Sequence, residues 1–115
     1  MPIEKRTRVE IFLPMRSDLD VYHVAIEWFA EELALTKGGA TLTTPFTGLY
    51  ASSTSVDLVS DSIRVLSCDF DTDPTDATEF NNLVLYLEEI KSGIMRILQE
   101  EEVWVVFYPI SRIIS

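Results

Sequence analysis

Three acidic residues, Asp69, Asp71 and Asp73, have the clearest chemical spacing in this sequence, because they alternate along one short segment. Alternate side chains of an extended segment point to the same side, and carboxylate oxygens are preferred ligands of Ca²⁺ and Mg²⁺. A calcium-binding loop would also need glycine where Pro74 stands and glutamate where Phe80 stands. A polar turn before a helix explains the same residues, so we expect no metal site and keep the three aspartates only as a weak alternative.

The single histidine and the single cysteine lack the partners that catalysis requires. His23 has no second histidine or cysteine near it in the sequence to complete a metal site, and no orienting group for a general base can be identified. Cys68 would have to ionise to act as a nucleophile, whereas the carboxylate of its neighbour Asp69 opposes thiolate formation. We therefore expect no catalytic residues and no cofactor, and we favour a protein that is not an enzyme.

Composition narrows the range of partners. The chain has 19 Asp and Glu against 9 Lys and Arg, which gives a net charge of −10. Phosphate backbones and anionic membranes bind clustered positive charge, so the excess of acids argues against nucleic acid and membranes as partners. A length of 115 residues fits one domain that spans residues 1–115. A lone cysteine, and no apolar run of signal-peptide length near the N-terminus, predict a cytoplasmic protein.

Two amphipathic helices and four strands are predicted from the spacing of apolar residues. Helical spacing indicates a first helix that opens at Ser17 and stops at Gly38, and a second, capped by Asp73, that ends near Glu101. The predicted core stripe of the first helix is Tyr22, Ala25, Ile26, Phe29 and Leu33, and that of the second is Phe80, Leu83, Val84, Leu87, Ile90, Ile94, Ile97 and Leu98. Alternation with a period of two indicates strands over residues 8–14, 40–50, 61–69 and 103–110. Because Pro45 falls inside the second strand and cannot donate to a ladder, we expect that strand to be interrupted and to lie at a sheet edge.

The order strand, helix, strand, strand, helix, strand is similar to that of ferredoxin-like domains, among them ACT-type regulatory modules and the dimeric α+β barrel families. We therefore predict an α+β, ferredoxin-like βαββαβ sandwich, with a four-stranded antiparallel sheet and two helices on one face. The resemblance implies that the last strand lies at an edge and that one sheet face has no helix over it. It covers topology alone and no sequence motif, so it implies no functional residues.

The sheet face without helices is the predicted functional surface. The last strand is apolar on both alternating sides, so its uncovered side would expose Trp104 and Tyr108 to water. We place on the uncovered face Arg8, Glu10, Phe12, Arg64, Leu66, Cys68, Trp104, Val106 and Tyr108. We place on the helix-facing side Val9, Ile11, Leu13, Ile63 and Val65.

A second copy of the chain is the simplest cover for such a face. The residues expected to form a homodimer interface are Phe12, Leu66, Trp104, Val106 and Tyr108. The residues expected to orient a bound ligand are Arg8, Glu10, Arg64, Trp104 and Tyr108. Within this set, Arg64 would either hold an anionic group with its guanidinium or form a cross-strand ion pair with Glu10.

The sequence favours a small homodimeric module that binds a ligand or another protein and does not catalyse a reaction. One alternative is a small cofactor-independent enzyme of the dimeric α+β barrel type, with its pocket between sheet and helices. A second alternative is an acidic protein whose helix surfaces mimic a polyanion and bind a partner. A pocket with converging polar groups would favour the enzyme. A flat, dry interface would favour the non-catalytic dimer, and clustered exposed carboxylates would favour the polyanion mimic.

Overall fold

The computed structural model describes residues 2–15, 20–37, 39–43, 46–51 and 58–114. In chain order its elements are β1 (Ile3–Met15), α1 (Asp20–Lys37), β2 (Thr41–Leu42), β3 (Phe46–Ala51), β4 (Leu58–Phe70), α2 (Ala77–Leu98) and β5 (Trp104–Ile113). The second predicted strand is therefore interrupted and appears as β2 and β3. The predicted helix cap at Ser17, the helix stop at Gly38 and the strand break at Pro45 lie outside the described residues.

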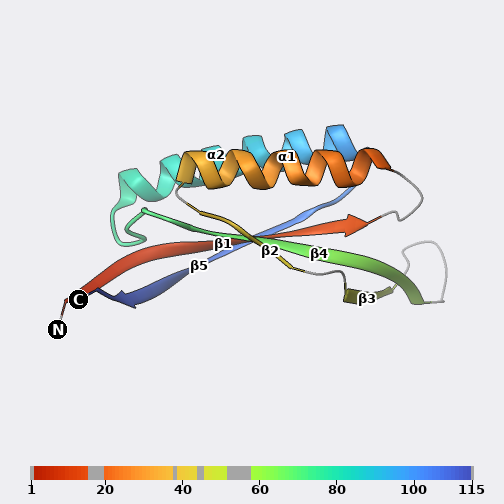
Figure 1. Ribbon diagram of the computed structural model, residues 1–115. Coiled ribbons are helices and arrows are strands. Elements are labelled where there is room, and N and C mark those ends of the chain that lie inside the picture. The colour runs from red at the N-terminus through yellow and green to blue at the C-terminus, as the bar shows by residue number, and fades with distance from the viewer. Residues whose placement is uncertain (1, 16–19, 38, 44–45, 52–57, 115) are drawn as a thin grey trace.

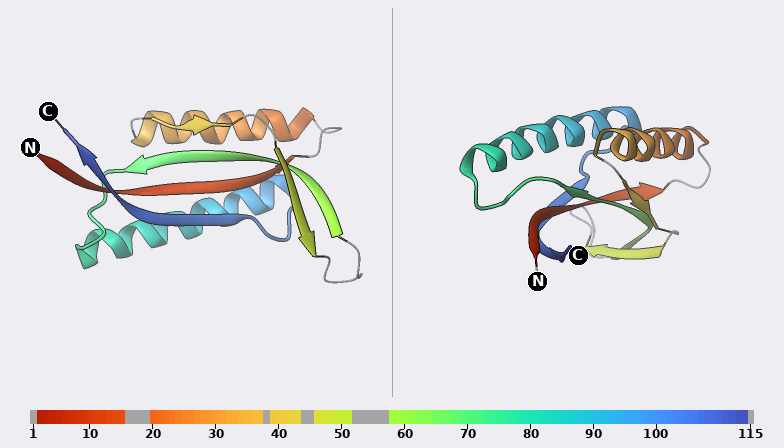
Figure 2. Two further views of the ribbon diagram at one scale, coloured as in Figure 1. Left: turned by 90° about the horizontal axis from the view of Figure 1, so that it is seen from below. Right: turned by 60° about the vertical axis from the view of Figure 1, so that its left-hand side comes forward.

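One antiparallel sheet carries both helices on a single face. Strands β2, β4, β1 and β5 lie side by side in that order, and β3 pairs with a different part of β4. Figures 1 and 2 show α1 and α2 next to each other over one face of the sheet, with no described helix over the other. With β2 and β3 counted together, this is the predicted four-stranded βαββαβ arrangement with the last strand at an edge. None of the described helices is long and apolar enough to cross a membrane.

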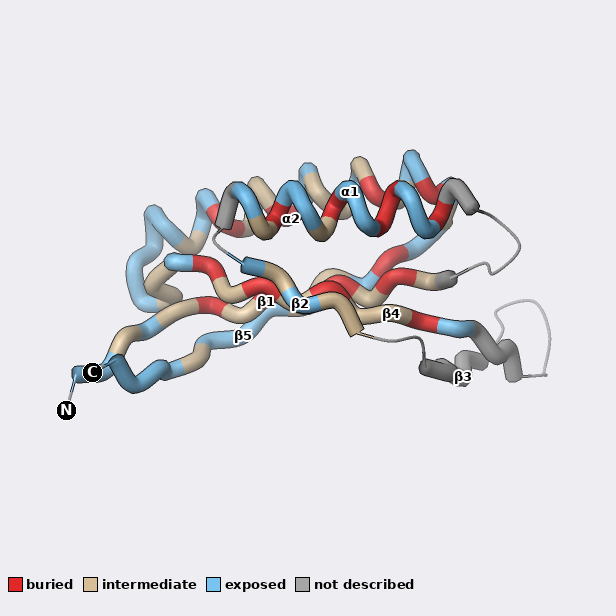
Figure 3. The backbone as a smooth tube through the Cα atoms, viewed as in Figure 1, coloured by how far each residue is buried: buried red, intermediate tan, exposed pale blue. Residues whose placement is uncertain are grey.

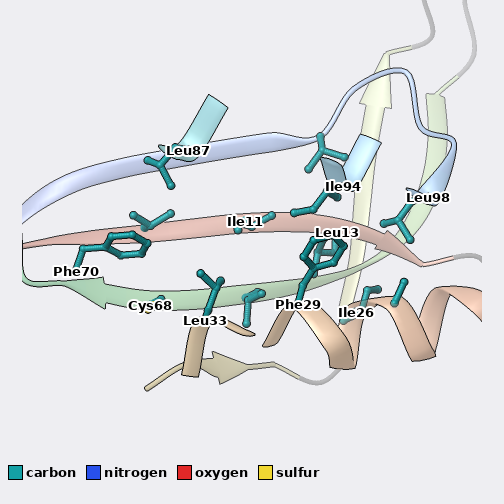
Figure 4. Packing of buried hydrophobic residues seen from close by; sticks show 14 of the residues in the cluster. Ile11, Leu13, Ile26, Phe29, Leu33, Cys68, Phe70, Leu87, Ile94 and Leu98 are labelled. Atoms are coloured by element: carbon teal, nitrogen blue, oxygen red, sulfur yellow. The ribbon is translucent and has the colours of Figure 1, made fainter. Parts of the chain in front are cut away.

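The hydrophobic core lies between the sheet and the helices. Figure 3 shows the buried residues on the sheet-facing sides of α1 and α2 and on alternate positions of the central strands. The predicted stripe of α1, namely Tyr22, Ala25, Ile26, Phe29 and Leu33, is buried in full. It packs against Val9, Ile11 and Leu13 of β1 and against Leu83, Leu87, Ile94 and Leu98 of α2, as Figure 4 shows for most of them. The alternation of β1 and the periodicity of α1 thus predicted their core residues correctly, whereas Ile97, which belongs to the predicted apolar stripe of α2, is 47% exposed.

The predicted orientation of β4 was wrong. Leu66 and Cys68 are 0% and 3% exposed and belong to the core, whereas they were expected on the uncovered face. The reason is the register with β1, in which Leu66 lies opposite Ile11 and Cys68 opposite Val9. Directly opposite residues of antiparallel strands share a face, so these two residues must face the helices. Arg64, two positions before Leu66, lies on that same side, while Val65 and Ile63 point to the opposite side, where Ile63 is nevertheless only 4% exposed.

Helix α2 begins later than predicted. Asp76 is its N-cap and accepts hydrogen bonds from the backbone N–H groups of Thr78 and Glu79 at 3.0 and 3.1 Å. Asp73, the predicted cap, instead accepts from the backbone and the hydroxyl of Thr75 and closes the preceding turn. This change follows from competition between two aspartates three residues apart, since either can cap a helix or an Asx turn.

The sheet is longer than the helix layer that covers it. Residues 3–6 of β1 pair only with β5, and residues 58–61 of β4 pair only with β3, so two-stranded ribbons extend at opposite ends of the sheet (Figure 1). The Cα radius of gyration is 15.8 Å, against about 13 Å for a compact chain of this length. Ile3 and Ile113 are exposed as a result, because neither of the described helices reaches the ribbon that they form.

The glycine inside α2 gives a test of this packing. A Cβ built on Gly93 has no other atom within 4 Å, so neither close packing nor a contact requires glycine there. We expect Gly93→Ala to raise the free energy of unfolding by about 1 kcal/mol, because alanine loses less backbone entropy in a helix. Asp76→Ala should lower the free energy of unfolding by about 1 kcal/mol, because the N-cap hydrogen bonds of α2 are lost. Urea denaturation measures both, and a loss of stability in Gly93→Ala would contradict the open space described here.

Candidate functional site

The sheet face without helices, called the open face from here on, changes character along its length. Five directly opposite pairs of β1 and β5 define it, namely Phe12 with Trp104, Glu10 with Val106, Arg8 with Tyr108, Arg6 with Ile110 and Glu4 with Arg112. Strand β4 adds Val65, Ser67 and Asp69, which lie opposite Phe12, Glu10 and Arg8. The face is therefore aromatic and aliphatic where β5 begins and charged where β5 ends.

The apolar half of the open face centres on two aromatic rings. Phe12 and Trp104 pack edge to face, with ring centroids 6.4 Å apart. Trp104 is nevertheless 61% exposed and Tyr108 is 38% exposed, since the described chain places nothing over this side of the sheet. Val106, which lies between them on β5, and Val65, which lies opposite Phe12 on β4, are half-buried. Large aromatic side chains left in water on a sheet face are typical of a surface that binds something.

The charged half of the open face begins with an ion pair across β1 and β4. The guanidinium of Arg8 donates from Nε and Nη2 to the two carboxylate oxygens of Asp69, at 2.7 and 3.0 Å. This two-point geometry fixes the guanidinium plane as well as its position. The hydrogen bonds from Arg8 lower the pKa of Asp69, against an opposing effect of burial, and Asp69 in turn raises the pKa of Arg8.

Two further arginines meet at Glu4. Arg6 donates from Nη1 to Glu4 Oε1 and Arg112 donates from Nη2 to Glu4 Oε2, both at 2.6 Å, and these bonds lower the pKa of Glu4. Arg6 also donates to the backbone carbonyl of Asp69 at 3.0 Å and lies 3.7 Å from Asp71. Its side chain is only 14% exposed, and its Nε is buried with no acceptor among the described residues. A buried N–H without an acceptor costs about 1–3 kcal/mol, so this atom is a candidate donor to a bound group.

The three arginines border a hollow of about 550 Å³ in the charged half of the face. Its lining consists of Arg6, Arg8, Gly39, Ala40, Thr41, Ser67, Cys68, Asp69 and Arg112. The segment of Gly39, Ala40 and Thr41 closes the side next to β4, because Thr41 pairs with Ser67. The volume falls within the range of about 300–1,000 Å³ found for small-molecule sites.

Where the apolar and charged halves meet, a tyrosine and a glutamate pair across β1 and β5. The hydroxyl of Tyr108 donates to Glu10 Oε1 at 2.5 Å, and this hydrogen bond raises the pKa of Tyr108. A tyrosine whose pKa is raised ionises less readily, and a carboxylate held by arginine accepts protons less readily. Neither Tyr108 nor Asp69 is therefore tuned for proton transfer near neutral pH.

The structure brings together only part of the predicted ligand site. Arg8, Glu10, Trp104 and Tyr108 share the open face as predicted, but Arg64 does not. It lies on the helix-facing side, where its Nε donates to the carbonyl of Thr43 at 2.8 Å, so no Arg64–Glu10 pair forms. Of the predicted dimer residues, Phe12, Trp104, Val106 and Tyr108 lie on the open face, and Leu66 is in the core.

Sequence reasoning missed Arg6 and Arg112, which line the hollow beside Arg8. Strand β1 was predicted to begin at Arg8 and β5 to end at Ile110, whereas both continue by several residues, to Ile3 and to Ile113. Charged residues in these extensions hide the strand pattern, because they carry no apolar alternation. The signal that would have found them is simple continuation of the period of two beyond each apolar segment.

The single histidine lies on the surface of α1, and the single cysteine lies in the core beside the hollow. His23 is exposed on α1. Cys68 is buried, and its Sγ donates to the carbonyl of Gly39 at 3.0 Å, so it borders the hollow from the core side. Neither has the setting of an activated nucleophile or a general base.

Comparison with known proteins supports the fold. No family model and no curated protein matches the chain. Among solved structures, it is similar to a phage SAM lyase in complex with S-methyl-5'-thioadenosine, with a TM-score of 0.56 and 14% identity over 93% of this chain and 90% of that one. A second is CPII, a nitrogen regulatory PII-like protein from Thiomonas intermedia K12 bound to ADP, AMP and bicarbonate, with a TM-score of 0.47 and 14% identity over 97% and 99% of the two chains. The ferredoxin-like α+β fold is thus shared with the lyase.

The Arg8–Asp69 pair predicts a pH-dependent contribution to stability. Because the folded pKa of Asp69 lies below the ordinary value of 3.8, its contribution is fully present above that value and is lost as pH falls through the folded pKa. We expect Asp69→Asn to lower the unfolding free energy by about 1 kcal/mol near neutral pH, since both side chains are partly exposed. Chemical denaturation over a pH series should show this difference shrinking below about pH 4. Glu88→Gln, at an exposed site on α2, is the control, and an equal loss in both variants would contradict the assignment.

The three aspartates at the end of β4 and in the turn that follows it, Asp69, Asp71 and Asp73, are expected to bind metal ions weakly at most. Asp69 is held by Arg8, Asp71 lies near Arg6, and Asp73 accepts from Thr75, so each carboxylate already has a partner. No group of metal-ligating side chains is found within the described part of the chain. We expect millimolar Ca²⁺ or Mg²⁺ to leave the melting temperature nearly unchanged. A rise of many degrees at micromolar metal, abolished by Asp71→Asn, would show that a site exists.

Proposed function

We propose that this chain is a non-catalytic, homodimeric, ligand-binding module of the cytoplasm. Its two copies meet over the apolar half of the open face, and its ligand binds in the hollow of the charged half. The observation that carries this proposal is the division of one uncovered sheet face into an aromatic half and a half with a polar hollow. Each half supplies what one of the two roles needs, namely apolar area for association and sparse, oriented polar groups for recognition.

The exposed side chain of Trp104 favours self-association. A large aromatic side chain carries about 150–250 Å² of surface, and more than half of it is exposed here. At about 25 cal/mol per Å², burial of that exposed part would contribute about 2–4 kcal/mol for each copy. Phe12 and Val106 lie beside it on the same face and would extend the contact. A second copy presents the same surface, so it is complementary in chemistry without any further partner.

The case for ligand binding without catalysis comes from the protonation of the charged groups. Arginine pairing lowers the pKa of Asp69 and Glu4, and pairing with Glu10 raises the pKa of Tyr108, so each of these groups holds its ordinary charge state more firmly at neutral pH. General acids and bases are tuned in the opposite direction, towards neutrality. Groups of fixed charge are suited to hold a ligand in place.

The two alternative functions receive less support. The hollow lies on the open face instead of between sheet and helices, which is where the dimeric-barrel alternative placed its pocket. The acids of α1, such as Glu27 and Glu31, alternate with the exposed apolar side chains of Val24 and Trp28. This mixed surface is a poor mimic of the uniform charge of a polyanion. The phage SAM lyase shows that the shared fold can hold a small molecule, but at 14% identity it says nothing about which one this chain binds.

Self-association gives a prediction with a matched control. Trp104 and Trp28 are similarly exposed, at 61% and 55%, but Trp104 lies on the open face and Trp28 on the outer side of α1. We expect sedimentation velocity to show a dimer for the unmodified protein and for Trp28→Glu. Trp104→Glu should be a monomer, because two buried carboxylates would face each other across the interface.

Circular dichroism should show that Trp104→Glu keeps the fold, since the substituted side chain is already in water within one chain. If that variant proves insoluble, Val106→Glu tests the same surface at a smaller side chain of β5. A monomer for the unmodified protein at high micromolar concentration would show that the proposed interface is wrong.

A further inference from the structure

The distribution of positive charge in this acidic chain is uneven. The protein has 9 Lys and Arg residues and a net charge of −10, yet three of its arginines line one hollow on the open face. Asp69 is the one acidic residue of the described lining, while Glu4 binds Arg6 and Arg112 from beside it and Asp71 lies 3.7 Å from Arg6. The carboxylates balance the charge of the guanidiniums, so the hollow is distinguished by its cluster of arginine N–H donors and not by a net positive charge.

The three guanidiniums retain donors for a ligand. Arg112 is 53% exposed and uses one nitrogen, Nη2, to bind Glu4. Arg8 donates from Nε and Nη2 to Asp69 and also interacts with the side chain of Tyr108, so its carboxylate partner uses two of its five N–H groups. Arg6 binds through Nη1 and Nη2 and keeps a buried Nε without an acceptor in the described structure. The carboxylates thus orient each guanidinium while leaving N–H groups that an anion can accept from.

The remaining walls of the hollow are small and polar. Gly39, Ala40, Thr41 and Ser67 supply hydroxyl and backbone groups, and a Cβ built on Gly39 would meet no other atom within 4 Å. No aromatic side chain occurs in the described lining, so the hollow offers no ring for a nucleobase to stack on. The walls therefore favour a compact, polar, anionic molecule over a flat aromatic one.

The hollow and the proposed dimer contact occupy different parts of the open face. Arg6 and Arg8, which line the hollow, are six and four residues from Phe12 on the continuous strand β1, which corresponds to about 20 and 13 Å at about 3.3 Å per residue. A dimer centred on Phe12 and Trp104 therefore leaves the charged half accessible to small molecules.

We propose that Arg6, Arg8 and Arg112 form a binding site for a small anionic ligand that carries a phosphate group or carboxylate groups. This assignment rests on the proposed ligand-binding function and specifies its ligand class. The guanidiniums bind the anionic group, as planar donor pairs bind phosphate and carboxylate. The hydroxyl and backbone groups of the segment from Gly39 to Thr41 contact the rest of the molecule.

Nitrogen-15 NMR titration of the full chain tests the assignment directly. The probes are inorganic phosphate, malonate as a dicarboxylate, and uncharged adenosine, each at constant ionic strength because salt screens such contacts. We expect phosphate or malonate to shift the amide signals of Gly39, Thr41 and Asp69 with saturation in the millimolar range or below. The amide of Gly93, in α2 and outside the lining, should not move. Comparison of phosphate with malonate then distinguishes a phosphate site from a carboxylate site.

A matched pair of variants separates a specific site from general charge effects. Arg112→Gln removes a hollow-lining guanidinium whose described hydrogen bonding is limited to Glu4. Arg96→Gln removes the same charge from an exposed position on α2. We expect Arg112→Gln to weaken anion binding at least about tenfold, as loss of a charge-assisted contact does, and Arg96→Gln to leave it unchanged.

The outcomes separate this inference from the function on which it rests. Equal binding by the Arg112→Gln and Arg96→Gln variants, or no saturable shift with either anion, would overturn the anion site. Saturable binding of adenosine without anion binding would keep a ligand-binding module but show that its ligand class is wrong. Anion binding by a protein that sediments as a monomer would uphold the site and remove the dimer from the proposed function.

Discussion

The pairing of β1 with both of its neighbours is the constraint on which the rest of this structure depends. Of the thirteen residues of β1, residues 7–12 pair with both β4 and β5, and the register places Ile11 opposite both Leu66 and Val105. Because side chains alternate with a period of two, a slip of one residue would exchange the core face of the strand for the open face. Burial of Val9, Ile11 and Leu13 therefore fixes at once which charges of β1 face solvent.

The same register brings charged side chains together at one end of the open face. Arg6 and Arg8 alternate with core positions, and antiparallel pairing brings Asp69 from β4 and Arg112 from β5 to meet them. Partly exposed ion pairs of this kind add little to stability, of the order of 1 kcal/mol or less each. Their larger effect is geometric, since a guanidinium held by a carboxylate stays in one orientation for a ligand.

The extension of the sheet beyond the helices is the second property that shapes the surface. The ribbon of β1 and β5 continues past the helices, and it carries Glu4 and Arg112 with it. A sheet trimmed to the helix layer would keep the fold and the aromatic half of the open face but would lose part of the hollow. The likeness to the phage SAM lyase concerns the fold, and the groups placed on it determine what each protein binds.

The sequence by itself determined the order of elements, the ferredoxin-like topology, the core stripe of α1 and the uncovered position of Trp104, because each depends on a strong local period. It did not determine the face of β4, since that strand carries apolar residues on both sides and only pairing with β1 selects one. It did not reveal Arg6 and Arg112 as neighbours, because charged strand ends carry no apolar alternation and are far apart in the chain. Only the pairing of β1 with β5 in the tertiary structure brings these two guanidiniums together around Glu4. The same pairing forms the hollow that they border.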